Sequence, residues 1–329
     1  MLTNRQNEIL KLIVLEYIKL ARPVSSNLIC DTLKCSSATV RSEMATLEEL
    51  GLLEKTHTSS GRVPSEKGYR YYVDNLMKLK EISGEDMLKL QLIFNNNQLE
   101  LSDCLKKSLE IVSDITNYTS VVLGTKSHDN TLKEVNIVPL SESKLTVIVI
   151  TDKGFVEHKT INVSGISLDE VKKTVNLINN LITGTPIDEV SAKLEFEVKP
   201  IIGNYVREHE RLYNAFYNVF SNFTNKNIDV VGKKNILKLP EFSSVDKLRD
   251  IMDKLEDNNI EKIVEEDSSN DINVYIGKES NIDEDVTVIK TKFKTDKEEG
   301  TIAIIGPKRM EYDRVVNLLE FIKNNVENK

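Results

Sequence analysis

The segment between residues 23 and 64 constrains the fold most strongly, because it has the pattern of two short helices, a tight turn between them and a hairpin after them. Ser25 or Ser26 can begin the first of these helices, and Ser36 or Ser37 can begin the second. A serine at such a position accepts a hydrogen bond from a free N–H group of the first helical turn. The spacing therefore predicts a helix–turn–helix and a two-stranded hairpin packed as one unit.

The flanking residues extend this unit in both directions. Thr3 and Gln6 form a capping box that opens an earlier helix, which must end before Pro23. Ser65 begins a further helix after the hairpin. Together these elements predict a winged helix-turn-helix domain over residues 1–80.

The second helix of the pair has the composition of a recognition helix. Val40, Met44 and Leu47 recur at helical spacing and are expected to face the core. The opposite side is small, polar and singly basic, so its backbone can approach the major groove while arginine and hydroxyl groups reach base edges or phosphates. The candidate DNA-contacting residues on this helix are Ser37, Ala38, Thr39, Arg41, Ser42 and Ala45.

The hairpin and the helix after it supply further candidates. Residues 56–64 are expected to form the tip and return of the hairpin, and Thr58–Arg62 would be the wing, with Arg62 placed to touch phosphate or the minor groove. The same shape also serves in protein–protein modules and in RNA-binding winged helices, so a scaffold without operator recognition stays as the alternative. Single-strand binding is disfavoured because we expect no exposed aromatic cluster. The candidates beyond the recognition helix are His57, Thr58, Ser59, Ser60, Arg62, Lys67, Tyr69 and Arg70.

The charge of the chain is divided unevenly between its two parts. The formal net charge is −8, which by itself argues against nucleic-acid binding. Residues 1–80, however, contain 12 Lys and Arg against 9 Asp and Glu, whereas the remainder contains 32 against 43. A mildly basic head on an acidic body concentrates the attraction for phosphate at one end.

Residues 85–329 predict an α+β body whose strands fall into two sets, separated by a mainly helical middle. Because distant strand groups must pair to bury their edges, this order suggests one sheet domain interrupted by an inserted domain. The predicted limits are 85–154 for the first part of the sheet domain, 155–240 for the insertion and 241–329 for the second part.

Other functional classes find little support in the sequence. No stretch approaches the roughly 18 apolar residues of a membrane helix, and no signal peptide is evident. Three cysteines without a CxxC pair fit reduced thiols, and four histidines in separate segments predict no metal site. A ligase carrying a DNA-binding head would need a Gly- and Arg-rich adenylate loop, which does not appear. We therefore expect a soluble, cytoplasmic protein that is not an enzyme and needs no cofactor.

Four segments carry a family resemblance. The run Thr58–Asp74 resembles the wing and following helix of the heat-inducible transcription repressor HrcA family, and Ser36–Leu52 resembles its recognition helix. Near the other end, Asn273–Glu279 and Gly300–Tyr312 are similar to that family's closing motifs. The resemblance spans the chain, with a weakly informative middle. Ser42 departs from the family pattern, in which Asn is usual, and this leaves base preference at that position open.

The resemblance implies a stress-response regulator. Such proteins are negative regulators of class I heat-shock genes and bind an inverted-repeat operator, CIRCE, upstream of chaperonin and DnaK operons. It also implies a homodimer built from a winged helix, a GAF-like domain and an inserted dimerisation domain, with a GroEL-type chaperonin as modulator. Two recognition helices related by a dyad would read two half-sites of double-stranded DNA, with an affinity that one mildly basic head would not reach.

Overall fold

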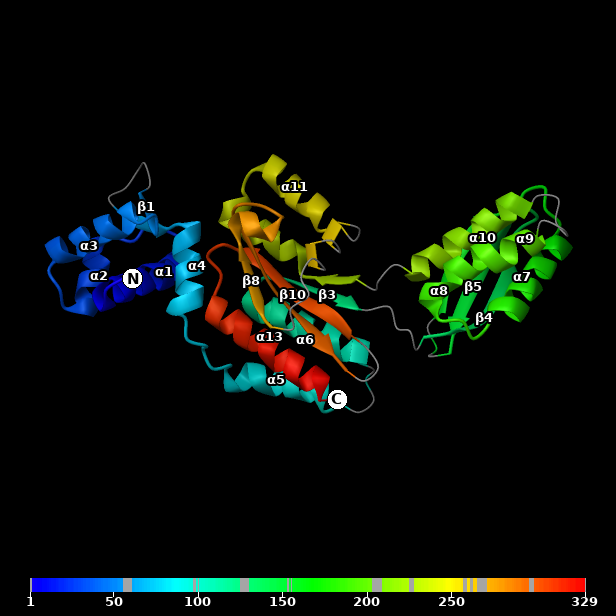
Figure 1. Ribbon diagram of the computed structural model, residues 1–329, viewed down its shortest axis with the longest axis horizontal. Helices are drawn as coiled ribbons and strands as arrows, with labels where there is room; N and C mark the ends of the chain where they lie inside the picture. The colour runs from blue at the N-terminus through cyan, green and yellow to red at the C-terminus, as the bar shows by residue number, and fades with distance from the viewer. Residues whose placement is uncertain are drawn as a thin grey trace. The chain divides into compact units, whose positions relative to one another are not determined.

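The protein divides into two compact units in a computed structural model (Figure 1). The first unit comprises residues 1–123, 228–295 and 300–329, and the second comprises 124–227 and 296–299. The structure describes residues 2–55, 61–96, 99, 101–124, 130–152, 154, 156–202, 209–224, 228–256, 259–260, 263–264, 271–295 and 299–328.

The N-terminal part of the first unit is the expected winged helix-turn-helix. Thr3 caps the first helix through a capping box with Gln6, and Ser36 caps the third by accepting a hydrogen bond from the Thr39 N–H. Gly51 follows the third helix with a φ of 72°, in the left-handed conformation predicted for it. The elements are α1 (Asn4–Leu20), α2 (Ser26–Leu33), α3 (Ser37–Glu49), β1 (Leu53–Lys55), β2 (Arg62–Pro64) and α4 (Glu66–Asn75), with β1 and β2 antiparallel.

A five-stranded sheet organises the rest of the first unit. Its order is β7-β3-β10-β9-β8, so strands from before and after the second unit lie side by side. Its strands are β3 (Thr119–Gly124), β7 (Ile228–Val231), β8 (Asn273–Ile276), β9 (Val286–Lys294) and β10 (Glu299–Pro307). The helices around it are α5 (Gly84–Phe94), α6 (Leu101–Thr116), α11 (Val245–Lys254) and α13 (Tyr312–Glu327), with short 3₁₀ turns η2 (Lys233–Lys238), η3 (Pro240–Phe242) and η4 (Gly277–Ser280).

Strand alternation divides the buried side chains of this sheet between two layers. In β10, Ile302 and Ile304 face the layer containing α5, α6 and α13, whereas Ala303 and Ile305 face the layer containing α11 (Figure 1). Successive side chains of a strand point to opposite faces, so a continuous apolar run is what a sheet covered on both sides requires. The first of these layers is continuous with the core of the winged helix.

The second unit packs helices on a three-stranded antiparallel sheet of order β4-β5-β6. Val147 and Val149 of β5 are buried against the apolar side of α7, and Asn179 of α7 hydrogen-bonds both the N–H (2.8 Å) and the carbonyl (2.9 Å) of Val135. The elements are β4 (Leu132–Pro139), β5 (Lys144–Thr151), β6 (Val156–Asn162), α7 (Leu168–Ile182), α8 (Ile187–Lys193), the π-helical turn η1 (Leu194–Val198), α9 (Lys199–Ile202) and α10 (His209–Thr224).

The α+β class is confirmed, but the limits of the insertion differ from the predicted 155 and 240. Strands β4 and β5, expected in the first part of the sheet domain, pair with β6 in the second unit. Strand β7, expected inside the insertion, pairs with β3 in the first unit. The main segment of the second unit therefore runs from Gly124 to Asn227. Apolar alternation identifies a strand but not the sheet that the strand joins, which explains the difference.

Among the residues that the structure describes, no helix is both long enough and apolar enough to cross a membrane.

Candidate nucleic-acid interface

Helix α3 has one buried face and one exposed face, as its sequence predicted. Val40 and Leu47 are fully buried, and Met44 is 3% exposed, so these three side chains anchor α3 in the domain core. The other side of the helix is open to solvent. Ala38, Arg41, Ser42 and Ala45 are exposed, while Ser37 and Thr39 near the first turn are partly buried.

The turn between α2 and α3 is held by side-chain hydrogen bonds. The Ser37 hydroxyl donates to the Asn27 side-chain oxygen (3.0 Å) and lies 3.1 Å from the Ser26 hydroxyl. Arg41 donates from its Nε to the same Ser26 oxygen at 3.2 Å, and its terminal amino groups have no hydrogen-bond partner in the part of the chain that the structure describes. This hydrogen bond ties one side of the Arg41 guanidinium to α2, while the side chain as a whole is exposed.

The wing strands are joined to α3 by an ion pair. Arg62 in β2 donates from Nε to the Glu48 carboxylate at 2.7 Å, and its backbone bridges to Val24 at the start of α2. The Arg62 guanidinium therefore already has a carboxylate partner, and a contact to phosphate stays a prediction. Four predicted wing contacts, His57, Thr58, Ser59 and Ser60, lie outside the described residues.

Helix α4 approaches β1 so closely that only glycine fits at one position. A Cβ on Gly68 would lie 2.1 Å from the Leu52 carbonyl oxygen. Ser65 caps α4 by accepting from the Gly68 N–H (2.9 Å), and its own hydroxyl donates to the Gly51 carbonyl at 2.6 Å. These contacts seat α4 against the end of α3 and the hairpin.

Three predicted contacts on α4 have different outcomes. Lys67 is exposed and donates from Nζ to the Leu50 carbonyl at 3.0 Å, at the C-terminal end of α3. Tyr69 is 1% exposed, so the prediction that it contacts DNA is wrong. Arg70 is partly buried, and its guanidinium binds the Val274 carbonyl and the Glu279 carboxylate of the sheet domain, so its contact with DNA stays a prediction. In both cases a segment far away in the sequence contacts the side chain.

The structure adds exposed cations that sequence reasoning did not single out. Lys34 occupies the left-handed C-cap of α2 with a φ of 50°, directly before the turn into α3. Lys55 ends β1, where the chain enters the wing, and it is exposed. Their signal in the sequence was position, since Lys34 precedes the turn into α3 and Lys55 precedes the segment predicted to be the wing.

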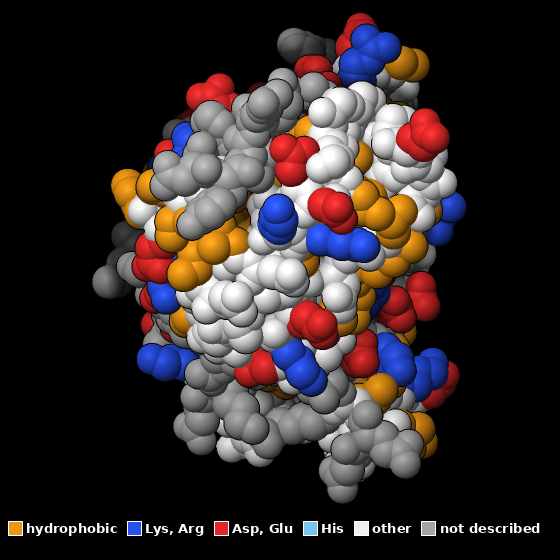
Figure 2. All heavy atoms as spheres, turned by 90° about the vertical axis from the view of Figure 1, so that its right-hand side faces the viewer, with side chains coloured by type: hydrophobic (Ala, Val, Ile, Leu, Met, Phe, Trp, Pro, Cys, Tyr) orange, Lys and Arg blue, Asp and Glu red, His pale blue; other side chains and the backbone are white. Residues whose placement is uncertain are grey.

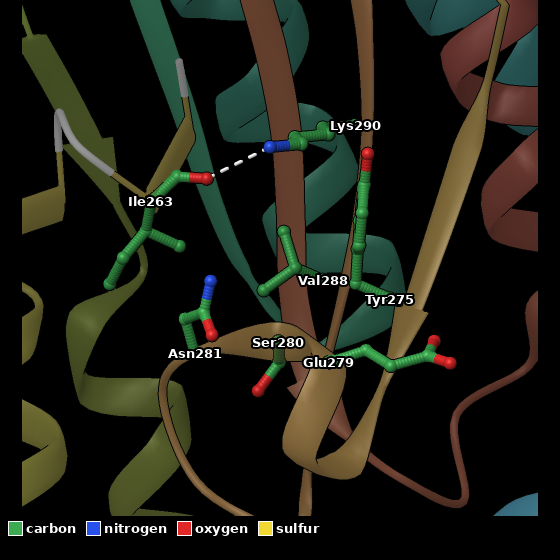
Figure 3. A pocket seen from close by; sticks show the side chains of 7 residues that line it. All are labelled: Ile263, Tyr275, Glu279, Ser280, Asn281, Val288 and Lys290. Atoms are coloured by element: carbon green, nitrogen blue, oxygen red, sulfur yellow. Dashed lines mark hydrogen bonds between the residues drawn. The ribbon is translucent and has the colours of Figure 1, made fainter. Parts of the chain in front are cut away.

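The described segments do not place a metal centre beside this surface. Within those segments, no group of three His, Cys, Asp or Glu side chains is arranged to hold a metal ion. A small pocket of about 130 Å³ lies in the sheet domain, away from α3 (Figure 3). There Lys290 donates to the Ile263 carbonyl at 2.9 Å and lies 4.6 Å from the ring centre of Tyr275, so its charge is engaged locally.

Comparisons with known proteins agree over the whole length of the chain. Residues 1–76 match the model for the winged helix-turn-helix DNA-binding domain of the transcription repressor HrcA, and residues 102–316 match the model for the HrcA C-terminal domain. The heat-inducible transcription repressor HrcA of Bacillus pumilus is 39% identical over 335 residues, covering 100% of this chain and 98% of that protein. A crystal structure described as a hypothetical protein has a TM-score of 0.67 at 24% identity, covering 100% of this chain and 98% of the other, which supports the fold. The chain therefore belongs to the HrcA family of winged helix-turn-helix transcription repressors.

Proposed function

We propose that this repressor binds an inverted-repeat operator in double-stranded DNA by laying the exposed face of α3 in the major groove. The observation that carries the proposal is the pairing of a fully anchored inner face with an outer face of small residues around Arg41. Ala38 and Ala45 leave room for the helix backbone to approach base edges, and the Arg41 guanidinium is free to make two hydrogen bonds to a guanine. Ser37, Thr39, Ser42, Arg62 and Lys67, together with Lys34 and Lys55, would add hydroxyl and phosphate contacts.

A homodimer is part of the same proposal, because an inverted repeat presents two equal half-sites. One mildly basic head gives weak, salt-sensitive binding, and joining two heads raises the affinity through effective concentration. The second unit offers a surface for this. Phe196, in the turn η1, is 78% exposed. Figure 2 shows hydrophobic side chains gathered in several groups between charged ones on the face it presents. The exposed large apolar side chains of this unit are Val138, Leu140, Val156, Leu168, Leu181 and Phe196.

The biological setting follows from the relatives rather than from the geometry. A relative named as a heat-inducible repressor supports a role in the heat-shock response. The CIRCE-type operator and the GroEL-type chaperonin as modulator are proposed from the family resemblance of the sequence. Repression needs occupancy of the operator and no chemical step, so we propose a non-enzymatic protein that acts in the cytoplasm, where bacterial DNA is accessible.

A mobility-shift assay tests the DNA-binding surface. An inverted-repeat duplex and a scrambled duplex are titrated with the wild type, Arg41→Ala and Arg249→Ala across a salt series. Arg249 is an exposed arginine on α11, outside the winged helix, and serves as the matched control. We expect Arg41→Ala to weaken operator binding about tenfold or more, with Arg249→Ala unchanged. Equal binding of both duplexes by the wild type would contradict operator recognition and favour the scaffold alternative.

Sedimentation tests the dimer, and a binding titration tests the modulator. Phe196→Asp should shift the protein toward monomer at micromolar concentration, whereas Val245→Asp, at an equally exposed apolar residue of the first unit, should not. A monomer at operator-saturating concentration of the wild type would refute the dimer. Purified chaperonin should change operator affinity, and an unchanged affinity would remove it as modulator.

A further inference from the structure

Helix α4 is fastened to the sheet domain by a polar contact that uses Arg70. The Arg70 guanidinium donates to the Val274 carbonyl of β8 and to the Glu279 carboxylate of η4. It also lies 3.6 Å from Asp74, one turn further along α4. β8 is the last strand of the five-stranded sheet, so its outer edge has no neighbouring strand in the order of that sheet. Arg70 therefore satisfies a carbonyl on a sheet edge and a carboxylate at once.

A second contact fits α4 to the same turn of the sheet domain. Glu66, in the first turn of α4, accepts a hydrogen bond from the Lys278 N–H at 3.4 Å. Gly277 lies under this carboxylate with a φ of 59°, and a Cβ there would come within 2.3 Å of the Glu66 Oε2. Turn η4 thus contacts two residues on one face of α4, Glu66 and Arg70.

Beside these polar contacts, two buried tyrosine rings form an apolar part of the interface. Tyr69 and Tyr312 are 1% and 0% exposed, and their ring centres lie 5.9 Å apart. On the side of α1, Arg309 pairs with Glu241 and reaches the Ile18 carbonyl at 3.5 Å. The winged helix consequently contacts the sheet domain through two of its helices and is not joined to it by a linker alone.

We propose that Arg70 and Glu279 are positioning residues that set the orientation of the recognition helix relative to the sheet domain. The inference rests on the operator-binding function proposed above. Helix α4 packs on α1 and β2, and α1 packs on α3, so a fixed α4 fixes α3. In a dimer, this contact is then one determinant of the distance and angle between the two α3 helices, and so of the spacing of half-sites that the dimer reads. Neither residue needs to touch DNA for this role.

The contact acts through effective concentration. When one head has bound, a rigidly held second head meets its half-site at the correct spacing and meets a wrong spacing poorly. A loosened head samples many orientations, so it loses part of the gain at the correct spacing and tolerates wrong spacings better. Contact with a single half-site depends on the winged helix alone and is unaffected.

A spacing series tests the proposal with the full chain. Affinities are measured for an isolated half-site duplex and for inverted repeats whose central spacer is lengthened or shortened in single base pairs. The variants are Glu279→Ala, Arg70→Ala and the charge exchange Arg70→Glu with Glu279→Arg. The control is Lys106→Ala, which removes the ion pair to Asp229 (3.0 Å) within the same unit and leaves the winged helix untouched.

We expect Glu279→Ala and Arg70→Ala to lower affinity for the preferred spacing roughly tenfold, to flatten the spacing profile, and to leave half-site affinity within about twofold. The charge exchange should restore part of the preference, and Lys106→Ala should match the wild type. An unchanged spacing profile in both single variants overturns the proposal, and so does an equal loss on the half-site, which would assign Arg70 to DNA. If the wild type itself fails to prefer an inverted repeat over a half-site, the operator function is what fails. Arg70→Ala and Glu279→Ala remove the same contact from opposite sides, so the test can be completed even if only one of the two variants folds.

Discussion

Replacing Tyr69 with phenylalanine should stabilise the protein. Its hydroxyl is buried and has no hydrogen-bond partner among the described residues, while its ring packs against Tyr312. Burial raises the pKa of this hydroxyl well above its usual value, so the group is neutral and contributes no charge. A buried hydroxyl without a partner costs about 1–3 kcal/mol. Phenylalanine keeps the ring contacts, and we expect a gain of about 1 kcal/mol.

Tyr312 supplies the matched control, because the same substitution there should have the opposite sign. The Tyr312 hydroxyl donates to the Lys308 carbonyl and lies 3.3 Å from the Thr287 hydroxyl. Removing this hydroxyl leaves the Lys308 carbonyl and the Thr287 hydroxyl without this partner, which should lower the free energy of unfolding by about 1–2 kcal/mol. Calorimetric unfolding of both variants measures the difference, at about 2–4 °C per kcal/mol for a domain of 150–250 residues. A Tyr69→Phe midpoint lowered as far as that of Tyr312→Phe would refute the reasoning. Operator affinity of Tyr69→Phe should equal the wild type, since this side chain is not at the DNA surface.

Three further outcomes are expected. Ala38→Leu, on the exposed face of α3, should block close approach to the major groove and lower operator affinity at least tenfold in a mobility-shift assay, with an unchanged melting temperature. Gly68→Ala should destabilise the winged helix by about 1–3 kcal/mol, because the new Cβ would overlap the Leu52 carbonyl, and a proteolysis or melting assay would detect it. Burial alone would raise the pKa of the Asp285 carboxyl. Hydrogen bonds and positive charge from Lys247 and Lys308 outweigh burial, so the pKa of Asp285 is lowered overall. Because the folded-state pKa is depressed, the stabilisation is present above the ordinary carboxyl pKa and is lost as pH falls below about 4, a loss that Asp285→Asn should lack in urea unfolding.

Local features of the winged helix could be predicted from the sequence because local interactions decide them. Thr3, Ser36 and Ser65 cap their helices through their own neighbours, so the start of each helix is readable within a few residues. The inner face of α3 was also predictable, since Val40 and Leu47 follow helical periodicity and are buried as expected. The outer face then followed by exclusion.

The sequence did not allow us to predict which distant segment packs against a given side chain or strand. Tyr69 and Arg70 lie just beyond the wing and were predicted to contact DNA. In the structure Tyr69 packs against Tyr312 and Arg70 pairs with Glu279, each more than 200 positions away. Likewise β5 was recognisable as a strand, but its alternation fits either sheet equally well. Periodicity states that a side is apolar or that a cation is present, and it does not state which distant segment covers it.

The buried layers of the molecule suggest why Tyr69 and Arg70 matter. The apolar layer of the winged helix continues without a break into the layer of α6 and α13, whereas the second unit has a core of its own. A perturbation of the sheet domain therefore reaches α3 through packed side chains such as Tyr69, while the core of the second unit need not change. Because the proposed dimer surface lies on that second unit, loosening of the sheet domain would alter how the two recognition helices are presented without separating the two chains. We therefore expect the affinity for an inverted repeat to depend on the contact of α4 with the sheet domain as well as on the groove-facing side of α3.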